Sequence, residues 1–244
     1  MGTVTLVIGA ASDIGAAICD VLEQRGDTVV AASRQPDLLG RGLQSRSANR
    51  HEIHCDVADL PSIQALFESC RSLAPSNLVY VAGYHRLAPL SPLSDGHLGR
   101  HLDVNVQGVF DACRFFSSAK YSRADAPRTV TLIASVAHRL GEAGLSAYAA
   151  SKAAMVAAGR AMAVEFGRKG IRVNTVSPGW IEGRKAEQVR STLAPEKFAE
   201  IVAQYPLGLG QARDVAHAVD FLSGDKARWI TGIDLVVDGG RTCL

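Results

Sequence analysis

Short runs of apolar residues alternate with longer amphipathic stretches along most of the chain. The short runs have the length of buried strands, and the longer ones have the period of helices that cover a sheet. This alternation predicts an α/β protein with a single-domain Rossmann fold, a doubly wound parallel sheet of about seven strands with helices on both faces. We expect strands at residues 4–8, 28–32, 51–55, 78–82, 130–134, 173–176 and 232–236, and helices at residues 14–25, 60–72, 98–119, 147–168 and 212–222.

Two segments depart from this alternation. Residues 34–50 are less regular, and Pro36, Gly40 and Gly42 predict a short or frayed helix there. Residues 183–204 have helical periodicity but stand between prolines 178 and 206, so we expect a lid over the substrate. The chain contains no repeat, no low-complexity segment and no linker. Residues 1–244 are therefore expected to form one domain.

Composition limits the classes of function. With 244 residues, 47% of them hydrophobic and 20% charged, the chain can bury one large core. A formal net charge of +2 gives no reason to expect nucleic acid or membrane binding. No apolar run approaches the ~20 residues of a membrane helix. Met1 and Gly2 pass directly into the first strand without a signal peptide, so we expect a cytoplasmic protein.

The cysteines have no paired spacing, and their odd count argues against a disulfide framework. We expect free thiols in a reducing compartment. No group of histidine, cysteine and aspartate has the spacing of metal ligands, so no metal site is expected. The cysteines are Cys19, Cys55, Cys70, Cys113 and Cys243.

Ser135, Tyr148 and Lys152 carry the strongest chemical signal. Tyr148 and Lys152 are four residues apart in an alanine-rich helix, so they share one face. A phenol titrates near ~10, and an ammonium one turn away lowers that pKa by favouring the phenolate. Ser135 ends an apolar run thirteen residues before Tyr148, and its hydroxyl could hold the oxygen that the tyrosine protonates. This pattern predicts acid–base chemistry on a substrate oxygen.

With these residues in place, the chain resembles the short-chain dehydrogenase/reductase family over residues 3–240. The resemblance implies that Tyr148 is the acid/base, that Lys152 lowers its pKa and holds the nicotinamide ribose, and that Ser135 orients the carbonyl. It also implies that Asn105, in the run Asp-Val-Asn-Val, holds a water for proton relay.

A glycine-rich turn follows the first strand and leads into a helix. Glycine lets the backbone approach a pyrophosphate, whose charge is met by the helix N-terminus. The family pattern is Gly-x-x-x-Gly-x-Gly, and Asp13 takes the place of the middle glycine. We expect its carboxylate to point away from the phosphates, as a helix cap. The resemblance assigns cofactor contacts to Gly9, Ala11, Ser12, Asp13, Ile14 and Gly15.

The end of the second strand indicates the cofactor. NAD-binding relatives have an acidic residue where this chain has Ser33, and Arg34 follows it. A small serine and a guanidinium suit a 2′-phosphate. NADPH is therefore expected, with NADH as the alternative. Asp56 and Val57 match the family pair that contacts adenine.

Other cofactor positions follow the family with exceptions. Tyr80 and Val81 replace two asparagines, so local hydrogen bonding must differ, while Ala82 and Gly83 still fit a backbone close to the cofactor. Gly183 replaces a threonine that relatives often supply to the nicotinamide carboxamide. The segment matched to the nicotinamide is Pro178, Gly179, Trp180 and Ile181, and the family also gives Tyr148 and Lys152 cofactor contacts.

Three stretches are expected to line the substrate pocket: the residues after the fourth strand, residues 136–144, and Trp180 with the lid. Their aromatic side chains suit a ring or an acyl chain. Together with the catalytic side chains, the expected substrate contacts are Tyr84, His85, Ser135, His138, Tyr148 and Trp180.

The resemblance is greatest to 3-oxoacyl carrier-protein reductases and related ketoreductases, whose tail the runs Pro206-Leu-Gly and Val237-Asp-Gly-Gly resemble. It implies NADPH-dependent reduction of a ketone or 3-oxoacyl group. The alternatives are an alcohol or sugar dehydrogenase working oxidatively and a non-catalytic dinucleotide-binding regulator. The substrate is a free small molecule or an acyl group on a carrier protein. A carrier protein would dock on Arg123, Arg128, Arg168 and Lys169. The alternative is that these cations complement the dipole at a helix C-terminus and otherwise face water.

A homotetramer is expected, because relatives pair their long helices and join across the last strand. The helix at 147–168 is apolar over more of its surface than one core-facing stripe needs. The residues concerned are Ala153, Met155, Val156, Ala157, Met162 and Val164.

Overall fold

A mostly parallel sheet runs through the centre of the computed structural model, which describes residues 3–35, 42–90, 96–123 and 125–244. Within this part of the chain the strand order is β3-β4-β2-β1-β5-β6-β7-β8, and only the β3–β4 pair is antiparallel. The seven predicted strands are present, so the predicted α/β fold is confirmed. The strands are β1 (Val4–Ile8), β2 (Thr28–Ser33), β3 (Gln44–Ser47), β4 (Arg50–His54), β5 (Asn77–Tyr80), β6 (Arg128–Ile133), β7 (Ile171–Pro178) and β8 (Asp234–Val237).

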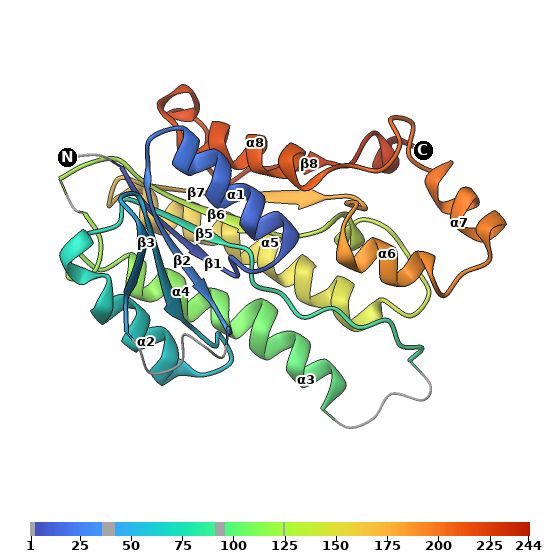
Figure 1. Cartoon of the computed structure of the whole chain (residues 1–244), viewed down its shortest axis with the longest axis horizontal. Coiled ribbons are helices and arrows are strands. Elements are labelled where there is room, and N and C mark those ends of the chain that lie inside the picture. Colours follow the sequence, from blue (N-terminus) through green and yellow to red (C-terminus); the bar gives the residue numbers. More distant parts are fainter. Residues whose placement is uncertain (1–2, 36–41, 91–95, 124) are drawn as a thin grey trace.

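Helices cover both faces of this sheet (Figure 1). One core cluster joins the sheet to α2, α4 and α5, and the other joins it to α1 and α8, which also pack on each other. Helices α6 and α7 lie at one end of the molecule (Figure 1). The helices are α1 (Asp13–Gln24), α2 (Leu60–Ser69), α3 (His97–Leu102), α4 (Gly108–Phe116), α5 (Ser146–Gly167), α6 (Arg184–Arg190), α7 (Pro195–Val202) and α8 (Ala212–Ser223).

Strand β3 was not predicted. Its four residues are polar and mostly exposed, so they lack the apolar alternation that marks a strand in the sequence. Pro36 and Gly40, which predicted a short helix, lie outside the described residues. Gly42 has a φ of +64° and stands two residues before β3. The described part of residues 34–50 therefore contains an edge strand where a helix was expected.

The predicted helix at 98–119 is divided into three parts. Helix α3 passes into a π-helical turn, Asp103–Gln107, and then into α4. A π-turn inserts a residue into the helix and frees a backbone carbonyl from the regular ladder. The sequence period cannot show this insertion, because the apolar positions continue on both sides of it.

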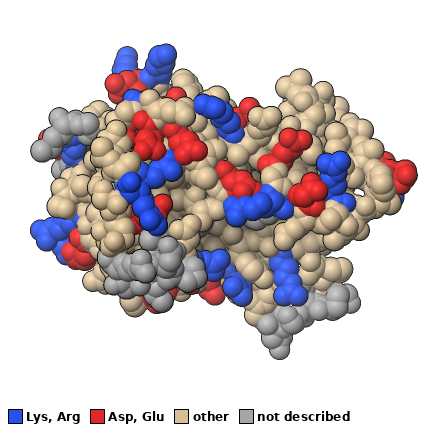
Figure 2. Space-filling view, in the orientation of Figure 1, with Lys and Arg blue, Asp and Glu red and all other residues tan. Residues whose placement is uncertain are grey.

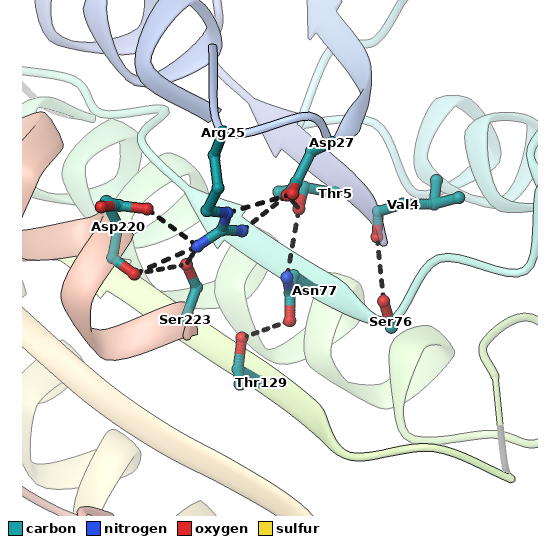
Figure 3. Close-up of polar contacts among 9 residues, drawn as sticks. All are labelled: Val4, Thr5, Arg25, Asp27, Ser76, Asn77, Thr129, Asp220 and Ser223. Atoms are coloured by element: carbon teal, nitrogen blue, oxygen red, sulfur yellow. Dashed lines mark hydrogen bonds and ion pairs between the residues drawn. The ribbon is translucent and has the colours of Figure 1, made fainter. Parts of the chain in front are cut away.

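A buried polar network crosses the sheet near the amino ends of its strands (Figure 3). The Thr5 hydroxyl donates to Asp27 Oδ2 at 2.6 Å, and Asn77 Nδ2 donates to Thr5 Oγ1 at 3.2 Å. The Thr129 hydroxyl donates to Asn77 Oδ1 at 2.7 Å. Asp27 is only 3% exposed, and Arg25 donates to both of its carboxylate oxygens, at 3.0 and 2.6 Å.

The same arginine connects this network to α8. Arg25 Nη1 donates to the Asp220 carboxylate at 3.0 Å and to the Ser223 hydroxyl at 2.8 Å (Figure 3). One guanidinium thus joins the α1–β2 turn to a residue 195 positions away in the sequence.

The cysteines are free, as predicted, and all but Cys243 are buried. Burial raises the pKa of the Cys19, Cys55, Cys70 and Cys113 thiols to about 12, which keeps them protonated and unreactive at neutral pH. None of the described helices has both the length and the apolar character needed to cross a membrane. Basic and acidic side chains are interspersed over the face drawn in Figure 2.

Candidate active site

The structure brings Asn105, Ser135, Tyr148 and Lys152 together at the carboxyl end of the sheet. Ser135 follows β6, Tyr148 and Lys152 lie in the first two turns of α5, and Asn105 lies in the π-turn. A Cβ atom at Gly83 would lie 3.5 Å from Lys152 Nζ and 3.6 Å from Asn105 Oδ1, so these two side chains both reach the end of β5. Ligands of open α/β sheets bind at this end.

Lys152 is held beneath the tyrosine ring. Its Nζ donates to the backbone carbonyl of Ile133 at 2.7 Å and lies 5.8 Å from the centre of the Tyr148 ring. The lysine is 3% exposed. A buried ammonium fixed in this way can stabilise negative charge on a substrate oxygen or donate a hydrogen bond to a cofactor ribose.

The pKa of Tyr148 does not follow the sequence prediction. Burial raises it above its usual value, a hydrogen bond with Ser135 lowers it, and the Glu142 carboxylate raises it further. We expected Lys152 to lower this pKa, whereas burial is the largest influence and raises it. A protonated phenol at this position can donate its proton to a substrate oxygen.

Asn105 ties the loop after β5 to helix α5. Its Oδ1 accepts from the Tyr84 backbone nitrogen at 2.8 Å, and its Nδ2 donates to the Tyr84 carbonyl at 3.0 Å and to Ser151 Oγ at 2.8 Å. Ser151 in turn donates to the Tyr148 carbonyl at 2.7 Å. These contacts position the loop and the catalytic helix, while the water-relay role implied by resemblance stays a prediction.

Tyr80 stands where the family has an asparagine, and it makes a hydrogen bond of its own. Its buried hydroxyl donates to the carbonyl of Val104 at 2.6 Å, inside the π-turn. A Cβ atom at Gly108 would overlap that hydroxyl, so the glycine leaves room for it. The phenol thus supports the turn that carries Asn105, and burial raises its pKa well above the usual value.

The turn after β1 fits the diphosphate of a dinucleotide. Gly9 has a φ of +96°, and a Cβ atom there would overlap the backbone of Ala82, so only glycine allows this approach. Ser12 caps α1 by accepting from the Gly15 nitrogen at 3.0 Å, and it donates to the Gly9 carbonyl at 2.9 Å. The turn therefore presents a glycine cradle at a capped helix N-terminus. Ala11 is exposed in this turn, and Ile14 packs against the core behind it.

A cavity of about 390 Å³ is lined by residues that follow β2, β4 and β5. Arg34 and Asp56, both predicted for the adenosine end, line it together with Gly83 and Tyr84. Ser33 and Val57, which neighbour Arg34 and Asp56 in the sequence, are buried. Arg100 also lines the cavity, and its guanidinium lies 4.8 Å from the centre of the Tyr84 ring. Sequence reasoning missed Arg100, because the expected continuous helix gave no sign that it faced the site.

The nicotinamide segment follows β7. A Cβ atom at Gly179 would lie 2.9 Å from Asp238 Cα, which shows how closely the chain packs there after Pro178. Ile181 forms a parallel bridge with Gly210. The Trp180 ring meets Phe198 of α7 edge-on at 6.0 Å. The segment 183–204 contains α6 and α7, and α7 contacts Trp180, while its role as a lid stays a prediction.

Histidines surround the catalytic phenol. The exposed His85 ring lies edge-on to Tyr148 at 4.7 Å, as expected for a pocket residue. His101, which sequence reasoning missed, is fully buried 6.2 Å from Tyr148 and 4.7 Å from Tyr84. Its Nδ1 lies 2.9 Å from the His97 carbonyl, and within the described residues its buried Nε2 has no hydrogen-bond partner.

His138 has a partner in the sheet. Its Nε2 lies 3.0 Å from Asp234 Oδ2, which also accepts from Arg139 at 2.7 Å. Burial raises the pKa of Asp234, but hydrogen bonds from Ser177, Arg139 and Thr175 outweigh it and hold the pKa below its usual value. The His138 ring therefore helps to fix the loop after Ser135 to β8.

Known proteins are similar to this chain over nearly its whole length. Residues 9–242 match the family model described as enoyl-(acyl carrier protein) reductase. The 3-oxoacyl-[acyl-carrier-protein] reductase FabG of Salmonella typhimurium is 33% identical over 98% of this chain and 97% of its own length. The oxidoreductase UcpA of the same organism is 29% identical over 99% of this chain and 95% of its own length. A variant of actinorhodin polyketide ketoreductase, solved with NADPH, superposes with a TM-score of 0.90 at 29% identity and covers 100% of this chain and 98% of its own.

The fold and the comparisons define an NAD(P)-dependent oxidoreductase. The chain belongs to the short-chain dehydrogenase/reductase family.

Proposed function

We propose that the chain uses NADPH to reduce the carbonyl of a ketone or 3-oxoacyl group to an alcohol. The observation that carries this proposal is the grouping of Asn105, Ser135, Tyr148 and Lys152 at the carboxyl end of the sheet, with Lys152 Nζ 5.8 Å from the centre of the Tyr148 ring. Incubating the protein with NADPH and a panel of ketones and 3-oxoacyl thioesters tests it by the loss of reduced-nicotinamide absorbance.

The chain's own residues perform the proton chemistry. The substrate oxygen accepts hydrogen bonds from the Ser135 and Tyr148 hydroxyls, which polarise the carbonyl. A bound NADPH supplies the hydride to the carbonyl carbon. Tyr148 gives its proton to the oxygen as negative charge develops there, and the Lys152 ammonium stabilises the phenolate that remains. The glycine turn, Arg34 and the segment after β7 are the residues that would hold the cofactor.

The raised pKa of Tyr148 suits proton donation to a carbonyl oxygen, and the same phenol would accept the proton in the oxidative alternative. The complete set of Asn105, Ser135, Tyr148 and Lys152 speaks against a regulator that has lost catalysis.

The preference for NADPH rests on Arg34. It is exposed and lines the cavity with Asp56, and Arg100 supplies a second guanidinium there. A charge-assisted contact to a 2′-phosphate contributes about 1.5–3 kcal/mol, or roughly ten- to a hundredfold in affinity. Arg34→Ala is expected to weaken NADPH binding by that factor and leave NADH nearly unchanged. Fluorescence titration of both cofactors measures this, with Arg168→Ala as the control, and equal losses for the two cofactors would contradict the assignment.

The aromatic rings of Tyr84, His85 and Trp180 are expected to contact the substrate, and they suit a ring or an acyl chain. Arg128, one of the predicted carrier-docking residues, is 4% exposed and donates to Ser122 and to the Lys169 carbonyl, so that prediction is wrong for this residue. Arg168 and Lys169, the exposed pair after α5, lie about 30 Å from Tyr148 along that helix. We therefore leave this patch out of the proposed substrate site, whether the acyl group is free or carrier-bound.

We also propose that the chain forms a homotetramer in the cytoplasm. Met155, Val156 and Met162 are buried, whereas Ala153 and Ala157 of α5 are exposed, so α5 is apolar on both sides. Four more apolar side chains are exposed on α5, on α4 and around the edge strand β8: Val164 at 75%, Phe110 at 47%, Trp229 at 90% and Leu207 at 85%. Packing the α4–α5 residues and the residues around β8 against other subunits would remove their apolar area from water. Static light scattering at micromolar concentration should give four chain masses, and a monomer mass would contradict the proposal.

A further inference from the structure

Asp13 and Gly183, the two unexplained departures from the family pattern, meet in the structure. The residue after Gly183 is Arg184, which begins α6. Its backbone nitrogen donates to Asp13 Oδ2 at 2.9 Å, and its Nε donates to Asp13 Oδ1 at 2.6 Å. Its Nη2 donates to the Ala11 carbonyl at 2.7 Å. Three hydrogen bonds thus join the first turn of the lid to the turn that follows β1.

The two departures depend on each other. Gly183 has a φ of +143°, a conformation that favours glycine, and a Cβ atom there would lie 2.5 Å from Asp13 Oδ2. The threonine of relatives would therefore collide with this carboxylate. A side chain at position 183 would therefore displace the Asp13 carboxylate from its place beside Arg184.

The position of Asp13 creates an electrostatic problem for the cofactor. It is the first residue of α1, whose N-terminus lies at the glycine cradle expected to hold a diphosphate. An unpaired carboxylate there would repel the diphosphate. The guanidinium of Arg184 offsets this charge, and 72% of the arginine side chain remains exposed to solvent.

We propose that Arg184 is a positioning residue for the nicotinamide dinucleotide: by pairing with Asp13 it neutralises the carboxylate beside the diphosphate and holds the lid against the cofactor turn. The inference rests on the dinucleotide binding of the proposed function and is independent of the substrate. It differs from the role of Arg34, because the diphosphate is common to NADH and NADPH.

The test is a double-mutant cycle read by direct cofactor binding without substrate. Arg184→Ala leaves Asp13 unpaired and is expected to weaken NADPH and NADH alike, by about two- to fivefold, because the pair is largely exposed to solvent. Asp13→Asn removes the charge and is expected to bind both cofactors at least as tightly as wild type. The Asp13→Asn/Arg184→Ala double mutant should regain near wild-type affinity, and Arg184→Lys should recover part of it.

Nicotinamide fluorescence gives the Kd of each variant, and thermal unfolding shows whether the variant is folded. Arg190→Ala is the matched control, since Arg190 lies on the same lid helix and pairs with Glu187 at 3.9 Å. If Arg184→Ala costs the same affinity in the wild-type chain and in the Asp13→Asn variant, the proposal is overturned. An unchanged Kd in folded Arg184→Ala would overturn it as well. Failure of wild type to bind either cofactor would refute the proposed function, and this inference with it.

Discussion

Replacing Tyr148 by phenylalanine is expected to lower kcat by at least ~100-fold, the usual contribution of a positioned acid. The phenol is the group that the structure places beside both Ser135 and Lys152. Phenylalanine keeps the ring and its contact with His85, so the pocket should keep its shape. Single-turnover kinetics with bound NADPH measure the step directly.

The variant should bind NADPH with nearly wild-type affinity, since the cradle and Arg34 are unchanged. Tyr121→Phe is the matched control, because that phenol bonds to Glu68 and Lys120 away from the site. Near wild-type turnover by Tyr148→Phe would show that another group supplies the proton.

Asp27→Ala is expected to cause the largest loss of stability, about 3–5 kcal/mol in the free energy of unfolding. Asp27 is 3% exposed and accepts from Thr5 and from two nitrogens of Arg25. Its removal leaves a partly buried guanidinium without its main partner and a buried hydroxyl without an acceptor. Urea unfolding followed by circular dichroism measures the change.

The control for this prediction is Asp20→Ala. Asp20 pairs with Arg50 at 2.7 Å, but its side chain is 58% exposed, so the loss should be below ~1 kcal/mol. Similar losses for the two variants would mean that the network at the amino ends of the strands contributes little to stability.

The sequence predicted the order of strands and helices because most elements bury one face, and burial leaves an apolar period. Strand β3 was missed because it pairs at the exposed edge of the sheet with polar residues. The π-turn at 103–107 was missed because its cause is tertiary: the Tyr80 hydroxyl bonds to the Val104 carbonyl from another element.

In the candidate site, too, the sequence predicted positions that follow a local pattern and missed properties that depend on tertiary contacts. Asn105, Ser135, Tyr148 and Lys152 could be named because each has a recognisable position relative to a strand or helix. The direction of the Tyr148 pKa was wrong because helical spacing shows the neighbouring cation but not the burial. Arg184 could not be linked to Asp13, since 171 residues separate the two in the chain.

Transfer of a label from the cofactor tests the central claim most directly. The protein is incubated with a ketone or 3-oxoacyl thioester and NADPH that carries deuterium at both C4 positions, and the product is analysed by mass spectrometry and NMR. The account predicts an alcohol with one deuterium on the former carbonyl carbon, formed by wild type and at least ~100-fold more slowly by Tyr148→Phe. An alcohol without the label, or no alcohol from any carbonyl compound while NADPH is bound, would contradict it.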